Sequence, residues 1–287
     1  MVEERGIDIK EVEPRAKILF INFSPGARPH MQMAQAMFGK DTESVESFKQ
    51  MAALTIQSPE KSIEPEVVGR EEQSILQLPE SPSDFAAIVM TGSPFAAYPR
   101  EAGGDRLFLA YWKKELFDFV RAAVGKDVPI LGICYGEQVL AEALGGKTVK
   151  MRSSGGESLI ETGWAVIRRS PGSVDDPVMR DLPSKFVAAE NHEDVVALLP
   201  PDAQLLCENK FGVQGFRIKG RKVWGFAFHP ERPPEVVREA LQLKAKRKRL
   251  ISQGQDPDEI QRLGKKYDPN IKTIFTNFLQ EAWLGVQ

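Results

Sequence analysis

The chain has few residues of the two kinds that form crosslinks or titrate near neutral pH: its 287 residues include two cysteines and three histidines. Cys134 and Cys207 lie far apart in the sequence, so no disulfide framework is indicated and a reducing compartment, the cytoplasm, is expected. No run of eighteen apolar residues occurs, and residues 1–17 lack the apolar core of a signal peptide. From these absences we expect a protein that is neither secreted nor bound to a membrane.

A marked excess of charge is also missing, since the formal net charge is −2 at pH 7. Such a balance gives no general attraction to nucleic acid or to an anionic membrane. The composition is 42% hydrophobic, which is enough for one substantial core. We expect one domain at residues 16–287, preceded by an N-terminal tail at residues 1–15.

Strand-like and helix-like segments alternate along the first half of the chain. The short apolar run 16–23 is typical of a buried parallel strand, residues 41–54 of a helix, and residues 107–124 of a long amphipathic helix. This order predicts an α/β fold with a doubly wound, mostly parallel central sheet. Short alternating runs after residue 146 predict antiparallel strands added at one edge.

Residues 128–146 combine a buried strand, Cys134, a tight glycine turn and an amphipathic helix. Gly132 and Gly136 permit a strained turn and close packing of strand against helix, which an ordinary core cysteine does not need. A helix N-terminus lowers the pKa of a thiol and offers N–H groups to an oxyanion. Cys134 is therefore the candidate nucleophile, whereas Cys207, without such a turn, is predicted to be a core residue.

A second apolar segment, residues 223–228, ends in His229-Pro-Glu231. Both this segment and the strand before Cys134 end where active sites lie in such sheets, at the carboxyl ends of the strands. His229 is the candidate base and Glu231 the group that orients it. His30 has no acid two residues later, and His192 lies in Glu-Asn-His-Glu-Asp before another strand, without the Pro-Glu pair that follows His229.

The two motifs resemble those of the class I, triad-type glutamine amidotransferases. Residues 132–138, Gly-Ile-Cys-Tyr-Gly-Glu-Gln, match that family's Gly-x-Cys-x-Gly-x-Gln elbow, and residues 229–231 match its His-Pro-Glu element. Residues 88–94 look like the strand and glycine turn that supply the family's other oxyanion donor. The resemblance spans roughly residues 16–284, with a charged helical insertion expected at about 235–270.

The resemblance implies a flavodoxin-like fold and cleavage of the γ-amide of glutamine through a γ-glutamyl thioester on Cys134. His229 would move the thiol proton and Glu231 would hold the imidazole, forming a Cys-His-Glu triad. Glu137 stands where the family most often has histidine. An acid at that position is expected to raise the pKa of the thiol or to alter the surroundings of the substrate.

Further site residues follow from the same resemblance. The backbone N–H groups of Tyr135 and of Ser93 or Gly92 would stabilise the oxyanion. Gln138 would help to position the substrate, although it also fits a helix residue that simply faces the sheet. His192 would lie in a polar loop near the substrate, or in an ordinary surface loop.

The resemblance implies no cofactor and no metal. The chain has no Gly-x-x-x-x-Gly-Lys-Ser/Thr phosphate loop, so a synthetase partner protein would have to use the ammonia in trans. Two alternatives remain: a γ-glutamyl peptide hydrolase that acts alone, and a catalytically silent regulatory or binding module. The intact Cys134, His229 and Glu231 weigh against the silent module.

The basic run 244–249 lies within the charged segment and contains five cationic residues. In a slightly acidic chain such a run is more typical of a solvated face or a protein-docking surface than of a nucleic-acid site. We therefore expect no nucleic-acid partner.

Overall fold

The computed structural model describes residues 18–22, 65–69, 78–92, 97 and 106–283. The N-terminal tail, the helix expected at 41–54 and the candidate oxyanion donor Ser93 all lie outside these described residues.

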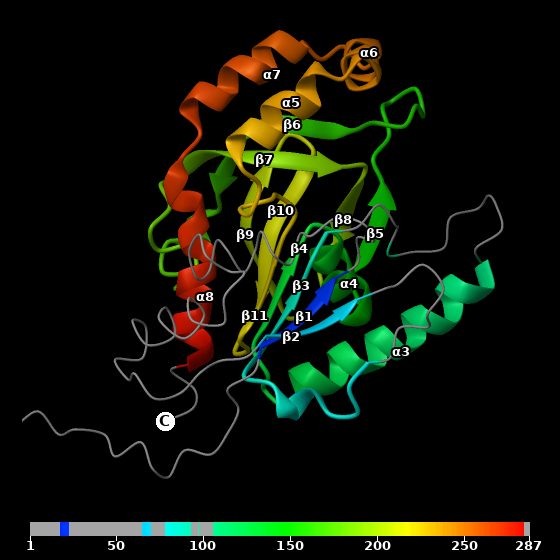
Figure 1. Cartoon of the computed structure of the whole chain (residues 1–287), viewed down its shortest axis with the longest axis vertical. Helices are drawn as coiled ribbons and strands as arrows, with labels where there is room; N and C mark the ends of the chain where they lie inside the picture. Colours follow the sequence, from blue (N-terminus) through cyan, green and yellow to red (C-terminus); the bar gives the residue numbers. More distant parts are fainter. Residues whose placement is uncertain (1–17, 23–64, 70–77, 93–96, 98–105, 284–287) are drawn as a thin grey trace, which may run out of the picture.

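A nine-stranded sheet forms the centre of the fold (Figure 1). Five neighbouring strands are parallel, in the spatial order β2 (Pro65–Gly69), β1 (Ile18–Asn22), β3 (Ala87–Met90), β4 (Ile130–Ile133) and β11 (Val223–Phe226). Four antiparallel strands continue the sheet, in the order β10 (Gly212–Ile218), β9 (Ala203–Asn209), β6 (Glu161–Arg169) and β7 (Lys185–His192). The predicted mostly parallel sheet with antiparallel edge strands is confirmed, and the parallel part has the flavodoxin-like order.

Helices cover both faces of β1, β3, β4 and β11, because these strands carry buried apolar side chains on both sides. On β1, Ile18 packs in a cluster with α8 (Thr273–Trp283). The next residue, Leu19, packs in a second cluster with α3 (Arg106–Gly125) and α4 (Tyr135–Ala143). The period of two along the strand thus distributes one apolar run between two cores.

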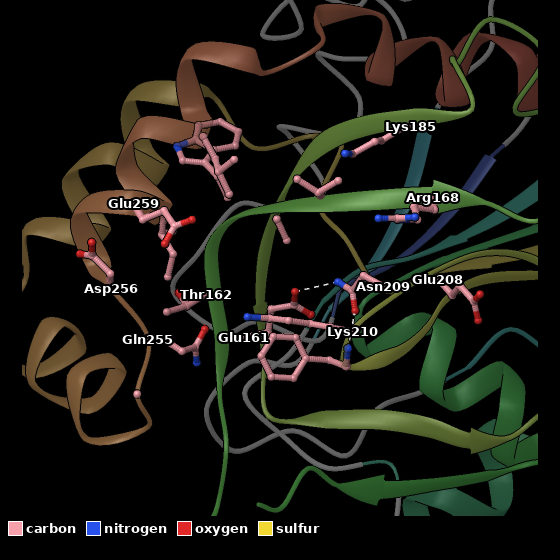
Figure 2. Close-up of a pocket in the computed structure, with 17 residues that line it drawn as sticks. Glu161, Thr162, Arg168, Lys185, Glu208, Asn209, Lys210, Gln255, Asp256 and Glu259 are labelled. Atoms are coloured by element: carbon pink, nitrogen blue, oxygen red, sulfur yellow. Dashed lines mark hydrogen bonds between the residues drawn. The ribbon is translucent and has the colours of Figure 1, made fainter.

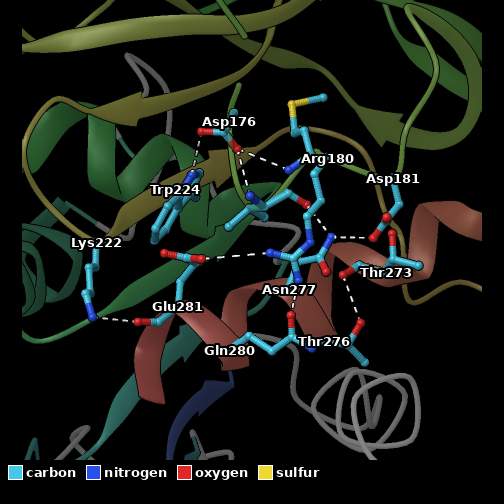
Figure 3. A network of polar contacts seen from close by, with 12 residues as sticks. Asp176, Arg180, Asp181, Lys222, Trp224, Thr273, Thr276, Asn277, Gln280 and Glu281 are labelled. Atoms are coloured by element: carbon cyan, nitrogen blue, oxygen red, sulfur yellow. Dashed lines mark hydrogen bonds and ion pairs between the residues drawn. The ribbon is translucent and has the colours of Figure 1, made fainter. Parts of the chain in front are cut away.

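Polar contacts fix α8 in place as well (Figure 3). Asn277 donates from Nδ2 to the carbonyl of Val178 at 3.1 Å and to Asp181 at 2.9 Å. Lys222 donates to the carbonyl of Glu281 at 2.6 Å. These bonds join α8 to the loop before β7 and to the residue that precedes β11. They therefore hold the helix at two positions along its length.

Three further helices lie over β6 and β7 (Figure 1): α5 (Pro234–Gln242), α6 (Lys244–Ser252) and α7 (Pro257–Leu263). Leu241 and Leu250 are buried against side chains of the two strands. The charged segment of the sequence therefore forms helices with one apolar side that packs on the antiparallel edge.

The remaining elements are short. They comprise the two-stranded sheet of β5 (Lys147–Lys150) and β8 (Asp194–Leu198), and the 3-10 turns η2 (Pro82–Asp84), η3 (Pro171–Ser173), η4 (Gly264–Lys266) and η5 (Pro269–Lys272). Among the described helices, none has both the length and the apolar character needed to cross a membrane.

Close contact between α4 and the sheet depends on glycine. A Cβ atom at Gly132 would lie 2.5 Å from the carbonyl carbon of Gly136. A Cβ atom at Gly136 would lie 2.6 Å from the carbonyl oxygen of Met90 on β3. Neither backbone atom can move without displacing its element, so both positions exclude a side chain.

We therefore expect Gly136→Ala to lower the free energy of unfolding by about 1–3 kcal/mol, since it overpacks a rigid contact. Gly125→Ala is the matched control, because nothing lies within 4 Å of a Cβ atom at that position at the end of α3. The control should be neutral or slightly stabilising. Urea unfolding of both variants measures the difference, and equal stabilities would contradict the close packing of α4 on β3.

Candidate active site

Cys134 occupies a strained turn between β4 and α4. Its φ is 54°, in the left-handed region that residues other than glycine rarely adopt. The backbone N–H of Cys134 donates to the carbonyl of Phe226 on β11 at 2.7 Å, which fixes the turn. Such an outlier, held by its surroundings, is typical of a functional position.

His229 and Glu231 form a buried pair just after β11. His229 Nδ1 lies 2.6 Å from Glu231 Oε1, and both side chains are almost fully buried. The backbone N–H of His229 donates to the carbonyl of Ala189 on β7 at 2.8 Å. The carboxylate of Glu231 thus orients the imidazole of His229, and the backbone of His229 is bonded to a strand that is distant in the sequence.

Gly92 shows that the sulfur and the imidazole border the same small space. A Cβ atom at this position would lie 3.0 Å from Cε1 of His229 and 3.7 Å from Sγ of Cys134. Gly92 follows β3, Cys134 follows β4, and His229 comes after β11. Since these three strands are parallel neighbours, their carboxyl ends bring the three residues together.

The electrostatics of the site favour neutral forms of the thiol and the base. Burial raises the pKa of Cys134 to about 11, although the positive charges of His192 and Arg232 act against this shift. Burial, followed by the charge of Arg232, lowers the pKa of His229. Burial opposes ionisation of Glu231, but its contacts with His229 outweigh burial and lower the pKa of that carboxyl.

At neutral pH the site therefore holds a thiol, a neutral imidazole and a carboxylate. In this state Nδ1–H of His229 donates to Glu231, which leaves Nε2 as an acceptor. Within the described part of the chain, Nε2 has no hydrogen-bond partner. The ring is thus able to accept a proton.

His192 lies in a second buried cluster beside the thiol. Its Nδ1 is 2.9 Å from the carbonyl of Asp194, and its Nε2 is 3.2 Å from both Glu161 and Glu190. Burial disfavours a charge on this ring, but the hydrogen bonds with the two carboxylates outweigh burial and raise its pKa well above the ordinary value. The resulting positive charge acts to lower the pKa of Cys134.

Glu161, Glu190 and His192 also form a donor set of the kind that binds metal ions, with ligand atoms within 4.8 Å of one another. Within the described residues, Glu161 is held by hydrogen bonds, whereas Glu190 is held by its ion pair with His192. Asn209 and Gln214 donate to the two oxygens of Glu161, at 2.7 and 3.2 Å. Burial and the charge of Glu161 raise the pKa of Glu190 to about 7, so this cluster can lower its own charge by taking up a proton.

The other predicted site residues are placed as follows. Tyr135 is the first residue of α4, where backbone N–H groups point out of the helix terminus. Gln138 is buried and donates to the carbonyl of Asp194 at 3.4 Å, the same oxygen that His192 contacts. The catalytic, oxyanion and substrate-binding roles of all these residues stay predictions.

A hollow of about 670 Å³ lies between β6, the β9–β10 turn and α7 (Figure 2). Neither Cys134 nor the His229–Glu231 pair lines it. Glu161 does line it and accepts from Asn209 there, while its other oxygen reaches His192. The hollow therefore adjoins the polar cluster and not the thiol.

Comparison with known proteins agrees with this arrangement. The family description "Glutamine amidotransferase class-I" matches residues 43–242, more than half of the chain. The chain belongs to the class I glutamine amidotransferase family. The family match ends at the last residue of α5, so α6, α7 and α8 lie beyond it.

Curated relatives of this amidotransferase are named as glutamine-hydrolyzing GMP synthases. The protein from Porphyromonas gingivalis is 30% identical over 157 residues, which are 54% of this chain and 26% of the relative. A glutamine-hydrolyzing GMP synthase subunit from Methanococcus vannielii is 29% identical over 38% of this chain and 53% of its own length. The chain thus spans about a quarter of the first relative and about half of the second.

Solved structures confirm the fold. A glutamine amidotransferase from Methylobacillus flagellatus has a TM-score of 0.65 at 19% identity, covering 95% of this chain and 96% of that structure. One from Thermotoga maritima has a TM-score of 0.61 at 19% identity, covering 94% and 99%.

Reasoning from the sequence missed the two carboxylates around His192. Glu190 could have been inferred, because residues two apart on a strand share a face. Glu161 could not, since its place opposite His192 depends on the pairing of β6 with β7. Glu137 was noted only as a departure from the family, although burial raises its pKa to about 8.

The raised pKa of Glu137 predicts that the free energy of unfolding depends on pH. Between the ordinary value of 4.5 and about 8, the folded chain keeps a proton that the unfolded chain has released. Stability therefore falls as pH rises through this window. Glu137→Gln removes this effect, so the stability of the variant relative to the unmodified chain should rise with pH, by about 5 kcal/mol across the whole window.

Urea unfolding at about pH 5 and about pH 9 tests this expectation. Glu239→Gln, at an exposed position on α5, is the matched control and should change stability little at either pH. An equal effect of Glu137→Gln at both pH values would contradict a buried, protonated Glu137.

Proposed function

We propose that this amidotransferase hydrolyses the γ-amide of glutamine with Cys134 as nucleophile. The observation that carries the proposal is the convergence of the strained Cys134 turn and the buried His229–Glu231 pair on the space beside Gly92. The names of the curated relatives, which are glutamine-hydrolyzing, support the same substrate.

The reaction begins with a neutral thiol, because burial raises the pKa of Cys134 to about 11. His229 Nε2 takes the thiol proton as the sulfur attacks the amide carbon. Glu231 stabilises the imidazolium that forms. The carbon–nitrogen bond then breaks, His229 returns the proton to the departing ammonia, and a γ-glutamyl thioester remains on the sulfur. Water hydrolyses the thioester to glutamate and restores the thiol.

Three features would lower the energy of this path. The backbone N–H of Tyr135, together with that of Gly92 or Ser93, would donate to the oxyanion of the tetrahedral intermediate. His192 acts through its charge, which favours the thiolate, since both of its ring nitrogens already have protein partners. Gln138 would position the substrate from the first turn of α4.

The ammonia would pass to a synthetase that is a separate protein. The GMP synthase relative from Methanococcus vannielii is named as one subunit of the enzyme. A partner in trans fits that relation, and the cytoplasm fits a thiol that must stay reduced.

Cys134→Ala should reduce glutamate release from glutamine by about a thousandfold or more. Cys207→Ala makes the same chemical change at a buried core position and should retain turnover. Glutamate release from L-glutamine and from a γ-glutamyl dipeptide is measured in parallel. Turnover of the dipeptide alone would favour the γ-glutamyl hydrolase.

A second measurement does not depend on turnover. A diazoketone analogue of glutamine should alkylate Cys134. Mass spectrometry would detect the modification as a mass shift on the peptide that contains Cys134. Turnover retained by Cys134→Ala, or labelling at Cys207 instead, would contradict the assignment of the nucleophile.

His229→Ala should lower kcat more than Glu231→Gln does, because removing the base costs more than weakening the group that orients it. Steady-state kinetics with glutamine over a range of pH measures both variants. The opposite order would mean that the two roles are misassigned.

A further inference from the structure

Two cations near the catalytic pair have no carboxylate partner among the residues that the structure describes. They are Arg232, which follows Glu231, and Lys246, which projects from α6. Within the described residues, no carboxylate oxygen lies within ion-pair distance of either side chain. Half-buried cations in this position are unusual unless an anion joins them.

Strand β7 connects Lys246 to the catalytic pair. The carbonyl of Ala189 accepts from the backbone N–H of His229 at 2.8 Å. Two residues further along, Asn191 Oδ1 accepts from Lys246 Nζ at 2.8 Å. Residues two apart on a strand lie about 7 Å apart, so Asn191, which Lys246 contacts, lies one such step from Ala189, which holds His229. Arg232 is bonded through its backbone N–H to His229 at 3.3 Å.

The partners of Lys246 are neutral. Besides Asn191, its Nζ contacts the hydroxyl of Thr162 at 3.2 Å. Burial, and then the charge of Arg232, lowers the pKa of Lys246. Burial raises the pKa of Cys134, and the charge of Arg232 acts against this shift, so the same guanidinium acts on both the lysine and the thiol.

Other basic residues of α6 differ from Lys246. Arg247 pairs with Asp258 at 2.8 Å, and Arg249 pairs with Glu193. Their charges are compensated within the protein, which is the usual state of such side chains. Lys244 and Lys248 are exposed to solvent. Among the described residues, Lys246 is therefore the half-buried cation of this run that has no carboxylate partner.

We propose that Arg232 and Lys246 form an anion subsite that binds the α-carboxylate of the γ-glutamyl substrate. A γ-amide placed at Cys134 extends its α-carboxylate away from the sulfur by the length of one side chain, which suits two cations at the edge of the site. One monovalent carboxylate would relieve the repulsion between them. The proposal rests on the proposed function, and it gives α6, which lies beyond the family match, a role in selecting the substrate.

Lys246→Met tests the subsite by kinetics. The KM for L-glutamine should rise about 10- to 100-fold with little change in kcat, because a contact shared by ground state and transition state is lost. Lys248→Met removes one exposed charge from the same helix and should behave like the unmodified chain. Lys246→Arg, which keeps the charge, should restore much of the affinity.

A substrate without the carboxylate separates binding of the anion from a general structural effect. The unmodified chain should turn over 4-aminobutanamide with a kcat/KM far below that for glutamine. In Lys246→Met, the ratio of kcat/KM for glutamine to kcat/KM for 4-aminobutanamide should fall by the same 10- to 100-fold. The kcat/KM for 4-aminobutanamide itself should be unchanged. An equal loss on both substrates would overturn the proposal.

Direct binding distinguishes failure of the subsite from failure of the proposed function. Calorimetry measures binding of L-glutamine to full-length Cys134→Ala, alone and combined with Lys246→Met or Arg232→Met. Binding that depends on both cations supports the subsite even where the unmodified chain releases no glutamate. Hydrolysis with the same KM in Lys246→Met, Lys248→Met and the unmodified chain would overturn the subsite while the proposed hydrolysis stands.

Discussion

The close approach of α4 to the sheet is the constraint on which the site depends. Gly132 and Gly136 let the helix backbone touch β4 and β3, and the turn between them forces Cys134 to a φ of 54°. The strain is held by the bond from Cys134 to the carbonyl of Phe226. Because that bond also joins β4 to the strand that leads to His229, one contact aligns the sulfur with the imidazole.

Burial and charge compete in this site, and burial dominates at the thiol. His192 and Arg232 both favour a thiolate, yet the pKa of Cys134 is still raised to about 11. The resting site is therefore neutral at the sulfur and at the imidazole. In the proposed reaction, proton transfer from the thiol becomes favourable only after a substrate has bound, excluded water and presented its carbonyl carbon to the sulfur. This requirement would limit reaction of the thiol with other electrophiles.

The sequence was sufficient where local rules decide the structure. Apolar runs specified the parallel strands, and the glycines around Cys134 specified the elbow. It was insufficient where distant strands set the outcome. The register that places Glu161 opposite His192 follows from the pairing of β6 with β7, and the neutral partners of Lys246 come from those same two strands. A basic run alone cannot show which of its charges are compensated.

The candidate site has two structural origins. Three parallel strands supply Gly92, Cys134 and His229, all within the residues that the family description matches. Strand β7 is separated from β11 by three strands in the sheet order, yet its Ala189 carbonyl bonds to His229, so the sheet must curl back on itself. This curl carries the helices packed on β6 and β7 to the edge of the site. Residues of α6 can then influence the substrate while the catalytic geometry remains that of the parallel sheet, so specificity can change there without disturbing the elbow.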